Sequence, residues 1–397
     1  MLPTPLRPAA SFSLLDITKF FGPTTGGIRT YLLEKARYVS ARPSLRQSII
    51  VPGIEDGIED GDGVRWYRLR GPRIPTQSPY RFMLRKRTMG RIIEHEKPDL
   101  VEVGSPYLVP WMVRRSVRAL EIPLVWFYHT NFPRIISPRP GQDTWIRRTA
   151  GRLADRYVRR LRQVFFAALA ASRAAVRELE HAGFERVIQV PLGVDLEHFH
   201  PRRQNHAAET RRRAGLPGGP LAMFVGRLAR EKEIQLVLDA WPEVEARTGA
   251  TLVLVGDGPS RQFFQQHSRA RRVKWVPYQT DRNALADLMA AADVIIAPGP
   301  AETFGLAVLE ALASGVPVIA SDAGAVREIV EASGAGVINP EPTAAAMADT
   351  VQDLFRRDLG ALGSQGRRYA EAHHGWSMAL DQIFAAYRQI QVEYRNA

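Results

Sequence analysis

The stretch that decides the fold reads Ala297-Pro-Gly-Pro-Ala-Glu-Thr-Phe-Gly-Leu-Ala-Val-Leu-Glu310. An apolar run typical of a buried strand, Val294–Ala297, ends where this stretch begins, and a helix is expected to open near Gly305. Glu302 then lies in the turn, and Glu310 lies two helical turns further on. A strand that passes through such a turn into a helix is the repeating unit of a parallel α/β sheet.

This turn has the features of an anion site. The backbone amides of Phe304, Gly305 and Leu306 are expected to be free at the helix N-terminus, where anions bind. A phosphate held there would have Glu302 and Glu310 on either side, each able to accept hydrogen bonds from hydroxyls of a sugar or a ribose. The alternative is structural: Glu302 complements the helix dipole and Glu310 is a solvated helix residue.

Two further loops in the same half follow predicted strands. The segment Val225-Gly-Arg-Leu-Ala-Arg-Glu-Lys232 places Arg227 and Lys232 between a strand and a helix, where the two cations could neutralise a diphosphate. The segment Leu254-Val-Gly-Asp-Gly-Pro259 is another turn at the carboxyl end of a strand. Three strand-to-helix turns of this kind in one half of the chain favour a ligand crevice at the carboxyl edge of its sheet.

The alternation of strand and helix extends through both halves of the chain. In the second half we expect strands at Leu221–Val225, Thr251–Val255, Val273–Val276, Val294–Ala297 and Val316–Ala320, and helices at Ile234–Thr248, Arg261–Arg269, Asn283–Ala291, Gly305–Ser314, Pro342–Arg356, Leu362–His373 and Ser377–Val392. In the first half we expect strands at Ser11–Ile17, Ser48–Pro52, Val64–Leu69, Leu100–Val103, Leu124–Tyr128 and Val187–Val190, and helices at Ile28–Ser40, Tyr80–Glu96, Tyr107–Leu120, Asp143–Arg162 and Ala171–Ala182. The polar, Pro- and Gly-rich segment 191–217 predicts a linker. The expected fold class is α/β, with two Rossmann-like doubly wound domains facing a central cleft.

The amino-acid composition narrows the possible classes of protein. The chain has 397 residues, 45% of them hydrophobic, and no cysteine, so disulfides and thiolate metal sites are excluded. No apolar run approaches the ~18 residues of a membrane span, and the opening MLPTPLRPAA lacks the apolar core of a secretory signal. We therefore expect a cytoplasmic protein.

The charge is unevenly distributed. Residues 1–190 carry 32 Lys and Arg against 17 Asp and Glu, whereas the remainder carries 22 against 24, so the whole excess of +13 lies in the first half. Such a half attracts nucleic acid, an anionic membrane or an anionic substrate. An arginine-rich genome is the alternative explanation.

The motifs of the second half resemble those of the family-4 retaining glycosyltransferases, which have the GT-B fold. The resemblance rests on VGRLAREK (225–232), LVLVGDGP (252–259), ADVIIAP (292–298) and ETFGLAVLEALASGVPVIAS (302–321), and on the junction phrase VPLGVDLEHFHP (190–201). It implies a nucleotide-sugar donor domain at 218–376 and an acceptor domain at 1–200, completed by the C-terminal helix 377–397.

The resemblance implies a role for individual residues. The catalytic set would be His129, Arg227, Lys232 and Glu302, and the donor-binding set Gly26, Gly27, Gly226, Gly256, Pro277, Thr303, Phe304, Gly305, Leu306 and Glu310. His129 would face the donor sugar, and Gly26-Gly27 would approach the phosphate closely, as only glycine allows. A plain Gly-rich turn and a structural histidine are the alternatives.

Three positions depart from the family pattern. Glu233 follows Lys232 where the family usually has Gly, and Pro277 also replaces a usual Gly. Pro298-Gly299 stands where the family has Pro-Ser. The loop with Pro277 normally approaches the nucleobase, so the choice among UDP, GDP and ADP donors stays open.

The implied reaction is transfer of a sugar from a nucleotide diphosphate sugar to a hydroxyl with retention, by front-face departure of the diphosphate. Arg227, Lys232 and the helix amides would stabilise the departing charge, so we expect neither a metal nor another cofactor. The D-x-D match Asp60-Gly-Asp62 lies in the acidic segment Glu55–Gly63, which predicts a solvated loop.

The acceptor is expected to be a membrane lipid or lipid-linked glycan. The predicted helices over Tyr80–Arg91 and Trp145–Arg162 are basic and amphipathic, and such helices lie on anionic lipid. This favours a peripheral protein on the inner face of the cell membrane, although a solvated basic face fits the same residues. The alternatives are a soluble acceptor, a GT-B epimerase or phosphorylase, and a nucleic-acid-binding protein; the last is disfavoured because no nucleic-acid motif is present.

Overall fold

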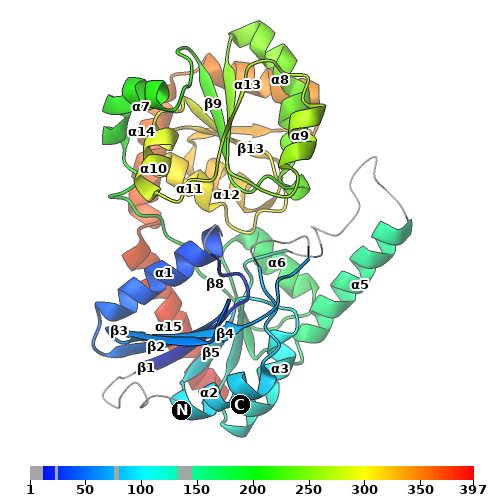
Figure 1. Ribbon diagram of the computed structural model, residues 1–397, viewed down its shortest axis with the longest axis vertical. Helices are drawn as coiled ribbons and strands as arrows, with labels where there is room; N and C mark the ends of the chain where they lie inside the picture. Colours follow the sequence, from blue (N-terminus) through cyan, green and yellow to red (C-terminus); the bar gives the residue numbers. More distant parts are fainter. Residues whose placement is uncertain (1–11, 23–25, 76–79, 132, 134–144) are drawn as a thin grey trace. The chain divides into compact units, whose positions relative to one another are not determined.

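The computed structural model describes residues 12–22, 26–75, 80–131, 133 and 145–397. The chain divides into two compact units, Met1–Pro191 with Leu380–Ala397, and Leu192–Ala379. Each unit is a mainly parallel sheet covered by helices (Figure 1), which confirms the predicted α/β class. The opening residues 1–11, residues 23–25 of the first Gly-rich turn and the first two residues of the predicted helix Asp143–Arg162 lie outside the described residues.

The first unit is built on an eight-stranded sheet. Its strands are β1 (Phe12–Ile17), β2 (Leu45–Gly53), β3 (Gly57–Gly61), β4 (Val64–Arg70), β5 (Leu100–Val103), β6 (Leu124–Phe127), β7 (Ala167–Ala170) and β8 (Val187–Gln189). The spatial order is β3-β4-β2-β1-β5-β6-β7-β8, and only β3 runs antiparallel to its neighbour. The carboxyl ends of β1, β5 and β6 therefore meet at one edge near the middle of the sheet, the usual place for a ligand in such folds.

Helices cover both faces of this sheet. One face packs against α2 (Lys86–Glu96), α3 (Val109–Ala119), α5 (Trp145–Leu161) and α6 (Arg173–His181), whose buried side chains form one cluster with Leu15, Val101 and Trp126 of the strands. The other face packs against α1 (Gly27–Ser40) and the end of α15 (Trp376–Arg395), where Phe384 and Tyr387 meet Phe12 of β1.

The second unit contains a six-stranded, all-parallel sheet. Its strands are β9 (Leu221–Val225), β10 (Thr251–Val255), β11 (Val273–Val276), β12 (Val294–Ala297), β13 (Val318–Ser321) and β14 (Gly336–Asn339), in the order β11-β10-β9-β12-β13-β14. One face is covered by α8 (Ile234–Thr248), α9 (Arg261–His267) and α13 (Ala344–Phe355) around the fully buried Trp241. The other face carries α10 (Arg282–Ala290), α11 (Leu306–Ala313) and α12 (Gly324–Ser333), with α14 (Leu359–His373) packed on α11 and α12.

The prediction of a linker at 191–217 was wrong. Residues from Leu192 onward belong to the second unit, so 192–200 do not belong to the first domain as expected. The segment contains the 3₁₀ helix η1 (Pro201–His206) and helix α7 (Ala207–Arg213). Its polar character misled the prediction because the polar residues bind neighbouring elements: Arg211 donates to the carbonyl of Ala291 at 2.8 Å and pairs with Asp293.

Two other predictions need correction. The acidic segment Glu55–Gly63 is not a loop: it contains β3, which is held to β4 by the backbone ladder and by Arg65. The predicted basic helix over Tyr80–Arg91 begins only at Lys86, because Met83 before it is drawn into the core and Arg81 donates to the carbonyl of Gly71. Strands β7 and β14 and helix α12 were not predicted.

No helix in the described part of the chain is both long enough and apolar enough to cross a bilayer.

Candidate active site

The turn between β12 and α11 forms an open helix N-terminus. Gly305 precedes α11 with a left-handed φ of 88°, and a Cβ there would lie 2.8 Å from Cγ1 of Val326, so only glycine fits. The amides of Phe304, Gly305 and Leu306 donate to no acceptor among the described residues, while Val308 already bonds back to Gly305 at 2.9 Å. Three amides at one helix end are therefore available to an anion.

The two predicted cations of the second unit are paired with carboxylates. Lys232, the last residue of the 3₁₀ helix η2 (Arg230–Lys232), forms an ion pair with Glu302 in the turn before α11. Arg227 pairs with Glu231 four residues later and keeps nearly half of its side chain exposed. The sequence did not predict either pair. Lys232 and Glu302 thus lie together beside the open helix N-terminus.

The structure shows the surroundings of two residues that depart from the family pattern, Glu233 and Gly299. Glu233 adopts a left-handed φ of 54°, a conformation that glycine reaches without strain and that costs other residues of order 1 kcal/mol. At Gly299 a Cβ would lie 3.1 Å from Cα of Lys232, so the absence of a side chain lets this turn approach η2 closely.

The turns after β9 and β10 touch through their glycines. A Cβ on Gly256, whose φ is 139°, would lie 2.0 Å from the carbonyl oxygen of Gly226, so this contact requires glycine. Pro277 follows β11 at the same edge of the sheet and is exposed, with its carbonyl accepting from the side chain of Gln279 at 2.8 Å. Gly226, Gly256 and Pro277 therefore all lie at the carboxyl edge, at the ends of adjacent strands.

Glu310 lies in the second turn of α11 and is largely buried. Burial raises the pKa of its carboxyl to about 7, although the charge of Arg282 opposes the shift and that of Asp195 adds to it. The sequence prediction missed both neighbours, and its only signal for Asp195 was its place in the junction phrase. A carboxylate held in this way gains from any ligand that donates hydrogen bonds to it.

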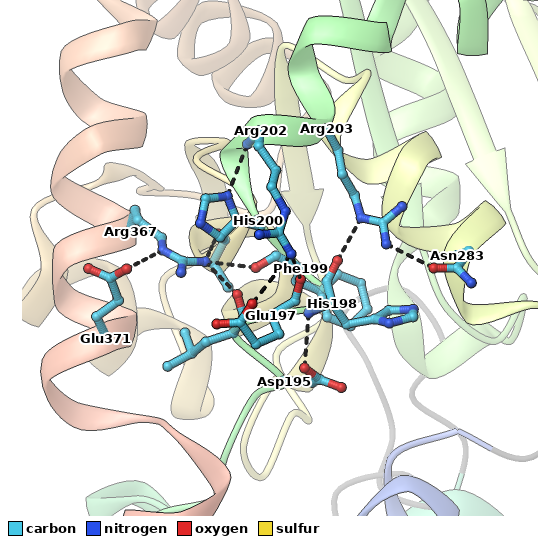
Figure 2. A network of polar contacts seen from close by, with 12 residues as sticks. Asp195, Glu197, His198, Phe199, His200, Arg202, Arg203, Asn283, Arg367 and Glu371 are labelled. Atoms are coloured by element: carbon cyan, nitrogen blue, oxygen red, sulfur yellow. Dashed lines mark hydrogen bonds and ion pairs between the residues drawn. The ribbon is translucent and has the colours of Figure 1, made fainter.

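The segment that carries Asp195 is firmly held (Figure 2). Asp195 accepts from the amide of His198 at 2.9 Å, and Arg203 donates to the His198 carbonyl at 2.7 Å and to Asn283 of α10 at 2.8 Å. Arg367 of α14 donates to the carbonyls of Leu196, Phe199 and Ala313 at 3.0, 2.8 and 2.8 Å. Two arginines thus fix the segment next to α10 and α14.

His129 of the first unit follows β6 and lies against aromatic rings. Its imidazole stacks on Phe127 at 4.2 Å between ring centroids and contacts Tyr31 of α1 at 5.0 Å. Burial, together with the positive charge of Lys35, lowers the pKa of His129 to about 3. The imidazole is therefore neutral at physiological pH and able both to donate and to accept a hydrogen bond.

A network of buried charged side chains lies near His129. The fully buried Lys35 binds Asp16 at 2.6 Å and Glu102 at 3.0 Å, and the hydroxyl of Tyr387 contacts both Lys35 and Glu102. Burial raises the pKa of Glu102 to about 7, while Lys35 opposes that shift. No sequence motif indicated this network, since its members are far apart along the chain.

Gly26 and Gly27 lie at the start of α1, the helix that carries Tyr31. Both are exposed, and a Cβ on Gly26 would meet no described atom within 4 Å. Among the described residues, nothing therefore packs against Gly26 at this helix end. Gly26, Gly27 and His129 lie in the first unit, whereas every other predicted site residue lies in the second.

The two aspartates of the D-x-D match, Asp60 and Asp62, make contacts that differ from those of metal ligands. Asp60 binds Arg65 through both carboxylate oxygens, at 2.6 and 2.8 Å, and Asp62 is exposed at the hairpin. Among the described residues no group of His, Cys, Asp and Glu is arranged to hold a metal ion.

The chain thus contains two α/β units, each built on a mainly parallel sheet, and the second has an open helix end beside a lysine and a largely buried glutamate, as the GT-B resemblance predicts. Residues 25–198 match the model of glycosyltransferase family 4, and residues 219–357 match that of the glycosyl transferases group 1. The chain belongs to glycosyltransferase family 4, as its motifs predicted.

Individual relatives cover almost the whole chain. A GDP-mannose-dependent alpha-(1-6)-phosphatidylinositol dimannoside mannosyltransferase of Mycobacterium tuberculosis is 32% identical over 96% of this chain and 97% of its own length. A GDP-mannose-dependent alpha-mannosyltransferase of the same species is 29% identical over 94% and 96%. Among solved structures, sucrose-phosphate synthase from Thermosynechococcus elongatus superposes with a TM-score of 0.77, at 22% identity, over 96% of this chain and 100% of that one, which confirms the fold.

Proposed function

We propose that this glycosyltransferase transfers a mannosyl residue from GDP-mannose to a hydroxyl of a phosphoinositide-type glycolipid, with retention of configuration and without a metal. The open N-terminus of α11 beside Lys232 carries the proposal, because a cation and three amides that have no acceptor among the described residues suit a diphosphate. The names of the two mycobacterial relatives support the choice of GDP-mannose, and the name of the first supports the lipid.

The donor would be held by residues of the second unit. The diphosphate would accept from the amides of Phe304, Gly305 and Leu306, and Arg227 would add a further positive charge. The ribose hydroxyls would donate to Glu310. Thr303, Gly226, Gly256 and Pro277 complete the predicted donor set at the same edge.

Donor binding would exchange the partner of Lys232. In the structure this lysine is paired with Glu302, so a diphosphate that captures the ammonium releases the carboxylate. Glu302 would then accept hydrogen bonds from hydroxyls of the transferred sugar. The neutral imidazole of His129 would bond to the same sugar without adding charge.

The chemical step would be a front-face displacement. The bond from the anomeric carbon to the β-phosphate oxygen breaks, the acceptor oxygen bonds to that carbon on the same face, and the departing phosphate takes the acceptor proton. The amides at α11, Arg227 and Lys232 would stabilise the charge that develops on the diphosphate. Because these groups already supply positive charge, no metal and no further cofactor is required.

A peripheral position on the inner, cytoplasmic face of the membrane would bring the enzyme to its lipid. Helix α5 supports this part of the proposal, because its N-terminal turns reach beyond the other helices of the first unit (Figure 1) and expose Trp145 (75%) and Leu153 (61%). The exposed arginines around them are Arg152, Arg156, Arg159 and Arg160. Such a combination of apolar and basic side chains suits the surface of an anionic bilayer. In α2, by contrast, Met89, Ile92 and Ile93 are buried in the core, so this helix offers only charge.

The experiment that tests the proposal has two stages. A thermal-shift panel of GDP-, UDP- and ADP-sugars identifies the donor, and we expect GDP-mannose to raise the melting temperature most. The protein is then incubated with that donor and mannosylated phosphatidylinositol in vesicles, and the products are analysed by mass spectrometry and by NMR of the anomeric proton. An α-linked mannosyl lipid supports the proposal; donor epimerisation, phosphorolysis or transfer only to soluble sugars would assign a different activity.

A further inference from the structure

Lys19 occupies a central position at the carboxyl edge of the sheet of the first unit. It follows the carboxyl end of β1, which lies between β2 and β5 in the sheet. Its backbone amide donates to Oγ of the buried Ser105, in the turn after β5, at 3.2 Å. The backbone of Lys19 is therefore fixed to the neighbouring strand end, and its side chain is half-buried.

The ammonium group of Lys19 lies against aromatic rings. Its Nζ is 3.8 Å from the ring centroid of Tyr107 and 5.0 Å from that of Phe20. Phe20 in turn packs edge-on against Tyr107 at 6.0 Å and against Tyr80 at 5.4 Å. All four side chains are half-buried, so each keeps part of its surface open to a ligand. Aromatic faces attract a cation without neutralising its charge.

Hydrogen bonds that involve α3 and α5 hold the turn that carries Tyr107. The hydroxyl of Tyr157, on α5, donates to the carbonyl oxygens of Pro106 and Tyr107, and Trp111 on α3 donates to this hydroxyl at 3.0 Å. Two helices of the unit thus fix the backbone of Tyr107. The aromatic group around Lys19 is consequently preorganised and does not depend on the charge of Lys19 for its shape.

The charge of Lys19 has no counterion among the residues that the structure describes. In the part of the chain that the structure describes, no carboxylate lies within ion-pair distance of Lys19, whereas the fully buried Lys35 has both Asp16 and Glu102. Burial accordingly lowers the pKa of Lys19 to about 8. A partly desolvated cation that retains its charge binds a phosphate more strongly than a lysine in free solution would.

We propose that Lys19 and the rings of Phe20, Tyr80 and Tyr107 form a subsite for the phosphate of the acceptor. This inference rests on the proposed glycosyltransferase function and assigns the residues that would bind the phosphate of the acceptor. The donor's diphosphate already has Arg227, Lys232 and the amides of α11 in the second unit, whereas the charge excess of the chain lies in the first 190 residues. The ring edges would contact the apolar face of the cyclitol or sugar that bears the phosphate.

The phosphate could come from a lipid headgroup, as a diester, or from a soluble sugar or cyclitol phosphate, as a monoester. Three water-soluble probes distinguish these sources: glycerophosphoinositol, inositol 1-phosphate and uncharged inositol. Binding of each to the full-length protein is measured by isothermal titration calorimetry, with GDP titrated in parallel. We expect the wild type to bind at least one phosphate probe tenfold or more tightly than inositol. Tighter binding of the diester assigns the subsite to a lipid, and tighter binding of the monoester assigns it to a soluble acceptor.

Substitution of Lys19 tests the residue itself. Lys19→Met is expected to weaken phosphate-probe binding at least tenfold while changing the affinities for inositol and GDP less than twofold. Lys19→Arg, which keeps the charge, should stay within about threefold of the wild type. Lys86→Met is the matched control, because it removes the same charge from an exposed site on α2. The melting temperature of Lys19→Met should not fall, since no ion pair is lost.

The proposal is overturned if the wild type binds neither phosphate probe better than inositol, or if Lys19→Met binds them as the wild type does. An equal loss of GDP affinity also overturns it, because Lys19 would then serve the donor. If Lys19→Met does not fold, Lys19→Gln takes its place, because it also removes the charge but keeps a polar side chain; binding of the phosphate probes by Lys19→Gln at the wild-type affinity overturns the proposal. A wild type that binds the phosphate probes but transfers no sugar refutes the proposed function and leaves the subsite standing.

Discussion

The negative charge of Glu310 should destabilise the folded protein. Its carboxyl has an ordinary pKa of 4.5, and burial next to Asp195 raises the pKa to about 7 despite Arg282. Because the folded state binds the proton more tightly, the stability associated with this group is greatest below the unfolded pKa and is lost as the pH rises through 7. At ~1.4 kcal/mol per pKa unit, the ionised side chain costs the folded state about 3 kcal/mol above pH 8 and about 1 kcal/mol at pH 5.5.

The variant Glu310→Gln keeps the shape of the side chain and removes its titration. We expect it to be more stable than the wild type in urea unfolding, by an amount that grows about 2 kcal/mol between pH 5.5 and pH 8.5. The pH-dependent part is the informative one, since any effect of the amide on packing is the same at both pH values. Nucleotide affinity should fall at the same time, by ~1–3 kcal/mol for the lost charged hydrogen bond. A stability difference that does not change with pH would refute the reasoning.

Three other predictions concern the site and the surface. Glu302→Ala should reduce turnover while leaving the affinity for free GDP nearly unchanged, because this carboxylate is expected to contact the sugar; equal losses of GDP affinity in Glu302→Ala and Glu310→Ala, measured by calorimetry, would contradict this division. Transfer should persist in EDTA and in Asp62→Ala, and activity that disappears with EDTA and returns with Mg²⁺ or Mn²⁺ would show that a metal is needed. Finally, a triple Arg-to-Glu variant of α5 should lose co-sedimentation with anionic vesicles at low salt, since each arginine contributes up to ~1 kcal/mol at such a surface. A triple variant of the second unit with the same charge change should bind normally, and equal loss in both would exclude a specific role of α5. The residues are Arg152, Arg156 and Arg159 on α5, and Arg212, Arg271 and Arg368 in the control.

The sequence predicted the second unit well because its elements are defined locally. The strands Leu221–Val225 and Thr251–Val255 and the helix Ile234–Thr248 have the bounds that periodicity gave, since continuous apolar runs and helical spacing mark buried elements directly. The open N-terminus of α11 could be predicted for the same reason: a strand, a glycine and a helix follow one another within the motif.

The failures occur where polar residues are fixed by distant partners. The segment 191–217 is polar and looks like a linker, but Arg367, more than 160 positions further along the chain, binds two of its carbonyls. The acidic residues of β3 are exposed, as predicted, but they lie in a strand and not in a loop, and Asp60 is bound by Arg65 across the hairpin. The same limit applies to the site: the positions of Glu302 and Lys232 were predicted, whereas their ion pair was not. Which charged side chains pair depends on their distances in the folded protein, and the periodicity of the sequence carries no information on these distances.

The contacts of Tyr387 have a consequence for the order of folding. The N-terminal end of a nascent chain leaves the ribosome first, so strands β1 to β8 emerge long before the last helix does. Until Tyr387 arrives, Lys35 and Glu102 each lack one of their hydrogen-bond partners, and Phe12 lacks the rings that cover it. The loop that must close spans the whole second unit, which makes this contact slow to form. We therefore expect the half of the protein that is synthesised first to finish folding last, and a chain truncated before the final helix to need a chaperone.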